Sequence, residues 1–186
     1  MHGTTIVAVH RDGVTALAGD GQVSLGDTIV KRGAVKVRTL ADGAVLVGFA
    51  GAVSDAFTLL DKFEGHLTAS KQNLLKAAVE TVKEWRTDRA LRNLEAMLIV
   101  GDRHQILSLS GHGDVIAPDE AVAAVGSGGA FAQAAAMALL RATDLPAEEI
   151  ARQALAIAGE IDVYTSGAGT ILTVGPETAN EGKDDA

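Results

Sequence analysis

The chain has 186 residues, of which 47% are hydrophobic and 22% are charged, and its formal net charge is −8. This length predicts one domain, and the composition is typical of a soluble globular protein. The negative charge and an aromatic content of only 3% argue against a protein that coats nucleic acid. The absence of cysteine excludes disulfides, thiolate metal sites and a cysteine nucleophile. No apolar run approaches the ~18 residues that span a bilayer, so we expect a cytoplasmic protein.

Hairpin signals dominate the first part of the sequence. Two pairs of apolar segments are each joined by Asp-Gly, the dipeptide favoured in two-residue type I′ turns. They are Thr5–Arg11 with Val14–Gly19 around Asp12-Gly13, and Val35–Leu40 with Ala44–Ala50 around Asp42-Gly43. The segment Gly21–Gly33 between them predicts an excursion with one short strand. Because Ile6–Val9 and Ala44–Val47 are nearly continuous apolar runs, we expect a sheet that is covered on both faces.

Helices and strands alternate in groups over the rest of the chain. Apolar residues at three- and four-residue steps predict helices over Val53–Leu67 and Leu74–Leu91. Alanine-rich Gly128–Ala142 predicts a third helix, and Pro146 begins a fourth. The further predicted strands are Ala96–Val100, Gln105–Ser110, Val122–Gly126 and Thr170–Val174. Two stacked, mostly antiparallel sheets with helices outside each would satisfy this order, so the predicted fold is α+β, a four-layer αββα sandwich.

The threonine pair in Gly3-Thr4-Thr5 is the first candidate for chemistry. A threonine hydroxyl is a poor nucleophile unless a base takes its proton. Cleavage just before the threonine turns its own α-amine into that base. A free α-amine has a pKa of about 7.7–8.0, so it is substantially neutral near physiological pH. Taken alone, however, Thr4 and Thr5 are more simply interpreted as β-formers that open a strand.

Lys36 and Asp20 are a second candidate pair. Lys36 alternates with Val35 and Val37, so its side chain leaves the predicted strand on the opposite face. If that sheet is covered on both faces, the ammonium is buried and requires a partner, which Asp20 could supply. Taken alone, Asp20 is more simply a turn residue between two glycines.

The glycine-rich loop Gly126-Ser127-Gly128-Gly129 lies between a predicted strand and a predicted helix, where phosphate-binding loops also occur. It lacks the third glycine of a dinucleotide fingerprint, since Phe131 stands there, and the chain has no P-loop lysine motif. A helix cap with Ser127 near the N-terminus is the simplest interpretation. The five histidines show no metal-ligand spacing.

Taken together, these segments resemble the HslV family, the proteasome-related peptidase subunits of bacterial ATP-dependent proteases (peptidase family T1). The similarity runs from Thr4 to about Val174 and rests on short motifs in the same order. They are Thr4-Thr5-Ile6-Val7, Ala18-Gly19-Asp20-Gly21-Gln22, Val47-Gly48-Phe49-Ala50-Gly51, Asp55-Ala56-Phe57-Thr58-Leu59, Trp85-Arg86-Thr87-Asp88-Arg89 and Gly126-Ser127-Gly128-Gly129. The resemblance implies an N-terminal-nucleophile hydrolase. Residues 1–3 would be a propeptide, 4–175 the peptidase domain and 176–186 an acidic, disordered tail.

The resemblance also assigns roles to individual residues. Thr4, once exposed, would attack the peptide carbonyl through its hydroxyl, with its own amine as the general base. Lys36 would ease deprotonation of the hydroxyl, and Asp20 would pair with Lys36 and orient it. The backbone N–H of Gly48 would donate to the oxyanion, and Ser127 would hydrogen-bond near the amine.

Binding partners follow from the same resemblance. A monovalent cation, sodium by family similarity, would be held by the carbonyls of Gly159, Asp162 and Thr165. Asp162 could add its carboxylate there or merely face solvent. Two stacked hexameric rings would form a homododecamer, and the hexameric ATPase HslU would unfold substrates, feed them in and activate the peptidase. Substrates would be unfolded or damaged proteins, and ATP would bind the partner rather than this chain.

The sequence is also compatible with two other functions, a stand-alone amidase and a catalytically silent subunit. Removal of Met1 alone would expose His2, so a threonine peptidase requires cleavage after Gly3, by self-processing. A stand-alone N-terminal-nucleophile amidase would act on small amides without an ATPase and without rings. A catalytically silent assembly subunit would keep its leader and tolerate Thr4→Ala. The joint presence of Thr4, Asp20, Lys36 and Ser127 favours catalysis.

Overall fold

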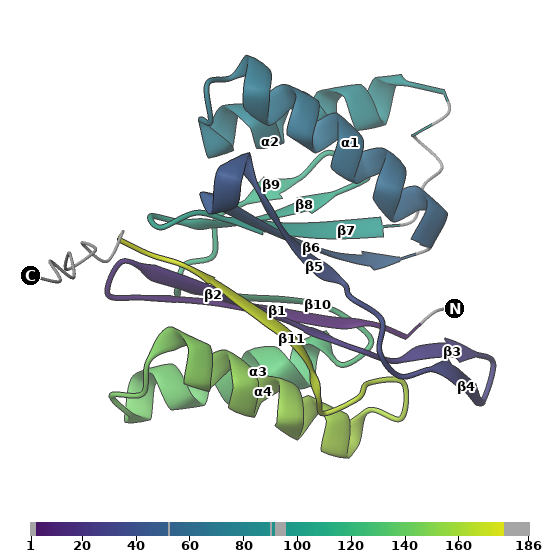
Figure 1. Cartoon of the computed structure of the whole chain (residues 1–186), viewed down its shortest axis with the longest axis vertical. Helices are drawn as coiled ribbons and strands as arrows, with labels where there is room; N and C mark the ends of the chain where they lie inside the picture. Colours follow the sequence, from purple (N-terminus) through teal and green to yellow (C-terminus); the bar gives the residue numbers. More distant parts are fainter. Residues whose placement is uncertain (1–2, 52, 90, 92–95, 177–186) are drawn as a thin grey trace, which may run out of the picture.

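Two antiparallel sheets lie face to face in the computed structural model, which describes residues 3–51, 53–89, 91 and 96–176 (Figure 1). One sheet contains, in spatial order, β10 (Val122–Gly126), β1 (Thr5–Arg11), β2 (Val14–Asp20) and β11 (Gly169–Val174). The other contains, in spatial order, β5 (Val37–Leu40), β6 (Val45–Gly51), β7 (Ala96–Gly101), β8 (Ile106–Ser110) and β9 (Val115–Ile116).

Two pairs of helices form the outer layers. Helices α1 (Val53–Ala69) and α2 (Leu74–Thr87) cover the sheet that contains β6, and α3 (Gly129–Ala142) and α4 (Ala147–Ile161) cover the sheet that contains β1 (Figure 1). The layers therefore follow the order helices, sheet, sheet, helices. This arrangement confirms the predicted αββα sandwich.

Strand β1 shows why the inner sheets are apolar on both faces. All four residues of Ile6–Val9 are fully buried. Ile6 and Ala8 lie in the core between the two sheets, whereas Val7 and Val9 lie in the core under α3 and α4. Because successive side chains of a strand point to opposite faces, a continuous apolar run is what a doubly covered strand requires.

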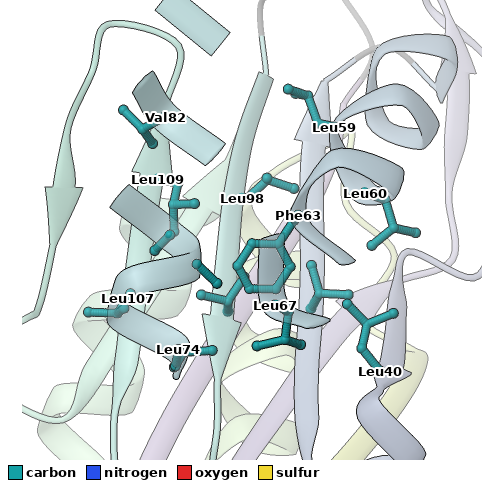
Figure 2. Close-up of a cluster of buried hydrophobic side chains, with 14 of the residues drawn as sticks. Leu40, Leu59, Leu60, Phe63, Leu67, Leu74, Val82, Leu98, Leu107 and Leu109 are labelled. Atoms are coloured by element: carbon teal, nitrogen blue, oxygen red, sulfur yellow. The ribbon is translucent and has the colours of Figure 1, made fainter. Parts of the chain in front are cut away.

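The two outer cores differ in the size of their side chains. The core under α1 and α2 contains Phe63, Trp85 and many leucines, several of which converge from both helices and the sheet in Figure 2. Alanine predominates in the core under α3 and α4, with Ile150 and Leu155 among the larger residues. Small side chains let α3 and α4 approach their sheet closely.

The two predicted Asp-Gly turns have different outcomes. Asp12 and Gly13 have φ values of +54° and +76°, as a type I′ turn requires, so the first hairpin is confirmed. The prediction of a two-residue turn at Asp42-Gly43 is wrong, because Leu40 pairs with Val45 and a short 3₁₀ turn over Ala41–Gly43 connects the two strands.

Other element boundaries also differ from the prediction. The excursion contains two short strands, β3 (Val23–Leu25) and β4 (Thr28–Lys31), which pair as a hairpin. Helix α2 ends at Thr87 rather than Leu91, because Asp88 has extended backbone angles. Strand β9 is additional, and Pro146 stands just before α4 rather than within it. Residues 177–186 of the predicted tail lie outside the described residues. Within the described ranges, no helix combines the length and apolar character needed to cross a membrane.

Candidate active site

Three strand ends meet around the candidate nucleophile. Thr4 immediately precedes β1 and is only 4% exposed. Its carbonyl oxygen accepts a hydrogen bond from the N–H of Ser127 at 2.9 Å, where β10 leads into α3. On the other flank, Thr5 donates its N–H to the Asp20 carboxylate at 2.8 Å, at the end of β2. Since β1 lies between β10 and β2, the neighbouring strands hold the Thr4-Thr5 segment from both sides.

Asp20 is fully buried and accepts hydrogen bonds on both carboxylate oxygens. Oδ1 accepts from the Thr5 N–H and from the Lys36 ammonium, each at 2.8 Å. Oδ2 accepts from the N–H of Gln22 at 2.9 Å and from the N–H of Ser166 at 3.3 Å. A buried carboxylate is tolerated when it is paired and hydrogen-bonded in this way. The expected pairing of Asp20 with Lys36 is therefore present.

Lys36 links this carboxylate to the start of the chain. It lies just before β5, which begins at Val37 rather than at Val35 as predicted, and its side chain is buried whereas Val35 is exposed. Its Nζ lies 3.4 Å from the Gly3 carbonyl oxygen. Nζ also donates to the Gln22 carbonyl oxygen at the root of the β3–β4 hairpin. Burial lowers the pKa of the Lys36 ammonium below its usual value, although attraction to Asp20 and their hydrogen bond oppose the shift. The result is a desolvated cation that contacts the carbonyl immediately before Thr4.

A second cluster of polar groups lies on the Ser127 side. The Asp162 Oδ2 atom accepts from the Ser127 hydroxyl at 2.6 Å and from the Thr165 hydroxyl at 2.5 Å. The Thr165 hydroxyl is also 2.6 Å from the hydroxyl of Thr5, which accepts the Gly128 N–H at 2.9 Å. The sequence left the Asp162 carboxylate either beside a cation or facing solvent; in the structure it is half-buried and accepts from these two hydroxyls, and its part in a cation site stays a prediction.

The direction of these hydrogen bonds follows from the chemistry of the groups. Burial alone would raise the pKa of Asp162, but hydrogen bonds from Ser127, Thr165 and the Tyr164 N–H outweigh it and hold the pKa below its usual value. Asp162 is therefore a carboxylate that can only accept. Thr165 uses its single hydroxyl proton on Asp162, so the Thr5 hydroxyl must donate to Thr165. Ser127 likewise uses its proton on Asp162 and presents lone pairs to its surroundings.

Gly48 occupies β6, paired with Val37 on β5, and is buried. A Cβ atom at this position would lie 2.8 Å from Ile6 and 3.2 Å from both Leu17 and Val37. Close packing against Ile6, Leu17 and Val37 therefore favours glycine here. The role of its N–H toward an oxyanion stays a prediction.

The residues expected to hold a cation lie at the end of α4 and in the turn that follows it. Gly159 is in the last turn of α4, where a Cβ would lie 2.3 Å from the Gly167 nitrogen. The Asp162 carbonyl accepts the Thr165 N–H at 3.0 Å. A carbonyl oxygen has a second lone pair, so this bond leaves the Asp162 carbonyl able to accept a further contact, and the sodium site stays a prediction. Among the described residues, no cluster of three or more acidic, histidine or cysteine side chains forms a metal site.

Sequence reasoning missed several members of the site. Gln22, the Thr5 hydroxyl and the side chain of Thr165 all contact the groups around Thr4, as described above. Thr5 and Thr165 are 160 positions apart, so no local pattern connects them. The adjacency of Thr5 to the candidate nucleophile was the one available signal.

Comparisons with known proteins agree with this architecture. The model of the proteasome subunit family matches residues 1–174. The ATP-dependent protease subunit HslV of Petrotoga mobilis is 58% identical over 166 residues, which cover 89% of this chain and 94% of that protein.

Solved structures show the same similarity. The eukaryotic HslV crystal structure from Trypanosoma brucei has a TM-score of 0.87 and 43% identity, covering 92% of this chain and 99% of that chain. The Thiobacillus denitrificans BPH in complex with epoxomicin has a TM-score of 0.70 at 20% identity, covering 92% and 98%, and supports the fold alone. The chain therefore belongs to the proteasome subunit family and, within it, to the HslV threonine-type peptidases.

Proposed function

We propose that this chain is the threonine endopeptidase subunit of an ATP-dependent protease, with Thr4 as its N-terminal nucleophile. The observation that carries the proposal is the buried Asp20–Lys36 pair, whose ammonium reaches the carbonyl oxygen of Gly3 at 3.4 Å. Neutralising Asp20 is a structural role for this cation, but that role alone does not account for its contact with the carbonyl immediately before Thr4. The cation is suited to polarise a carbonyl or stabilise a deprotonated hydroxyl beside it.

The first reaction is removal of the leader. The Thr4 hydroxyl attacks the Gly3 carbonyl carbon, the Gly3–Thr4 C–N bond breaks, and the hydroxyl proton ends on the Thr4 nitrogen. The product is an ester between Gly3 and the Thr4 oxygen. Water then hydrolyses this ester, which releases the leader carboxylate and leaves Thr4 with a free hydroxyl and a free α-amine. Lys36 assists by donating to the Gly3 carbonyl oxygen as negative charge develops on it.

Cleavage of a substrate peptide repeats the same chemistry with a better base. The freed α-amine takes the proton of the Thr4 hydroxyl, directly or through a water, as the hydroxyl attacks the peptide carbonyl. Lys36 lowers the cost of charge on the attacking oxygen, and the Gly48 N–H donates to the oxyanion. The proton passes to the leaving amine, and water hydrolyses the acyl-enzyme ester in a second step.

Ser127 and Asp162 help to orient the α-amine that serves as the base. Because Ser127 gives its hydroxyl proton to Asp162, its oxygen is left as an acceptor next to the Thr4 backbone. It can therefore accept a hydrogen bond from the α-amine and orient that base toward the Thr4 hydroxyl.

We propose the assembly and partners of the HslV family for this chain. Two stacked hexameric rings would enclose the sites, and the hexameric ATPase HslU would unfold proteins and deliver them. A sodium ion held by the carbonyls of Gly159, Asp162 and Thr165 would stiffen the turn that carries the Asp162 carboxylate. The high identity to an HslV that is described as an ATP-dependent protease subunit supports this proposal.

The test is hydrolysis of an unfolded protein by the purified chain, with and without HslU and ATP, alongside Thr4→Ala. We expect degradation that requires HslU, ATP and Thr4, in particles of dodecameric mass. Turnover of small amides by a monomer without HslU would instead favour the amidase function. Full activity of Thr4→Ala would exclude a nucleophilic role for Thr4.

A further inference from the structure

Gly3 is enclosed by Tyr164 more tightly than any side chain would allow. A Cβ atom at position 3 would lie 2.1 Å from the Tyr164 Cβ, 2.8 Å from its carbonyl oxygen and 3.0 Å from its Cγ. Real Cβ atoms essentially never approach another heavy atom within 3.0 Å. The nearest contact is with the Cβ and backbone of Tyr164, not with the far end of a flexible side chain. Tyr164 therefore forms a wall beside the bond that must be cleaved.

This wall is fixed by contacts on each side. The Tyr164 N–H donates to the Asp162 Oδ1 atom at 3.2 Å, and the Tyr164 hydroxyl donates to the Asp27 carboxylate at 3.4 Å. The preceding carbonyl, of Val163, accepts from the Gln22 side chain at 2.9 Å. Tyr164 is thus tied both to the turn after α4 and to the β3–β4 hairpin, so it cannot easily retreat from a larger residue at position 3.

The position of Gly3 matters because its carbonyl is the group that would be attacked. This carbonyl lies 3.4 Å from the Lys36 ammonium, while the next carbonyl, of Thr4, is held by the Ser127 N–H. A methyl group at position 3 could not fit at 2.1 Å from the Tyr164 Cβ, so the leader would have to shift, and the Gly3 carbonyl would shift with it relative to Lys36. A misplacement of about 1 Å costs roughly 10²-fold in rate when reacting groups depend on orientation.

We propose that Tyr164 is a specificity-determining residue for leader removal, admitting only glycine at position 3. The inference rests on the proposed self-cleavage after Gly3. Tyr164 can have this role only in the precursor, because a chain that begins at Thr4 no longer has a residue at position 3. Tyr164 therefore positions the substrate of the first reaction without serving as acid, base or nucleophile.

The test exploits the difference between the Tyr164 Cβ and its ring. The full chain is made by cell-free translation, and the fraction that begins at Thr4 is followed over time by intact mass. We expect Gly3→Ala to slow leader removal roughly 10²-fold. Adding Tyr164→Gly to Gly3→Ala removes the atom 2.1 Å away and should recover at least about tenfold of that loss. Adding Tyr164→Ala removes the ring but keeps the Cβ, and should recover little.

Folding is controlled by exposing Thr4 independently. Each variant is also made as a ubiquitin fusion from which a deubiquitinating enzyme releases a chain that starts at Thr4. The released chain lacks position 3, so its peptidase activity does not depend on leader removal. A released chain about as active on peptides as one without substitutions has an assembled site. If the fusion-derived chain with native Tyr164 is inactive on peptides, the proposed function fails. If it is active, but Gly3→Ala is processed at the normal rate or Tyr164→Gly rescues no better than Tyr164→Ala, the role of Tyr164 alone is overturned.

Discussion

Two carboxylates flank the Thr4-Thr5 segment, and they are satisfied in different ways. Asp20 is fully buried and receives an ammonium together with three backbone N–H groups. Asp162 is half-buried and receives two hydroxyls and one backbone N–H. A charge that is removed from water needs an opposite charge, whereas one that keeps contact with water can be satisfied by neutral donors. We infer that the Asp20 cluster stabilises the fold and places a positive charge near Thr4. The Asp162 cluster determines which of the neighbouring hydroxyls donate and which accept hydrogen bonds.

The largest effect is expected where both clusters meet, at Thr4. Thr4→Ala removes the nucleophile and keeps the hydrogen bonds of the backbone, so the fold should be unchanged. Peptidase activity should fall by more than about 10⁴-fold, because a missing nucleophile cannot be replaced by its neighbours. Thr4→Ser, which keeps a hydroxyl, is the matched control and should retain measurable turnover.

Breaking the Asp20 cluster should damage both stability and activity. Lys36→Met leaves the Asp20 carboxylate buried without its cation, and should lower the free energy of unfolding by about 3–5 kcal/mol. Activity of the folded fraction should fall about 10²–10³-fold. Urea unfolding followed by circular dichroism, with peptidase assays below the transition, checks both numbers. Stability equal to that of the unmodified chain would contradict the importance of the ion pair.

An interruption of the hydroxyl chain should have a smaller effect. Thr165→Val keeps the shape of this buried side chain but removes the hydroxyl between Thr5 and Asp162. The Thr5 hydroxyl loses its acceptor, which should cost about 1–3 kcal/mol of unfolding free energy. Thr165→Ser restores the hydroxyl, so it should recover most of this loss. A serine variant as unstable as the valine variant would assign the effect to packing instead.

The smallest effect is expected from Asp162 itself, and it depends on pH. The pKa of Asp162 is lower in the folded protein than its usual 3.8, so its ionisation stabilises the fold above that value. The contribution is lost as the pH falls through the lower, folded pKa. The unmodified chain should therefore exceed Asp162→Asn in stability near neutral pH and converge with it in strong acid. Thermal unfolding at several pH values measures this, and a constant difference would contradict the carboxylate role.

The Asp20 cluster could be predicted from the sequence better than the Asp162 cluster. Strand alternation between Val35 and Val37 predicted a buried Lys36 that needs a partner, and both features are present, although β5 begins at Val37 and Lys36 lies just before it. The same reasoning predicted the two sheets from Ile6–Val9. Periodicity is a local signal, and both successes depend on residues that are close in sequence.

The Asp162 cluster depends on contacts that periodicity does not encode. Asp162 follows a helix, where no alternation fixes the direction of a side chain, and its partner Ser127 is 35 positions away. The enclosure of Gly3 by Tyr164 is equally nonlocal. The sequence also missed the second strand of the β3–β4 hairpin, because strands of three and four residues leave little periodicity to detect.

The most direct test of the central claim is the intact mass of the protein after native expression, beside Thr4→Ala prepared in the same way. If Thr4 is the nucleophile of both reactions, the unmodified chain begins at Thr4, and the variant retains Gly3 and the residues before it. An unmodified chain that retains Gly3 and still cleaves protein substrates would contradict the account. So would a Thr4→Ala chain that loses its leader normally.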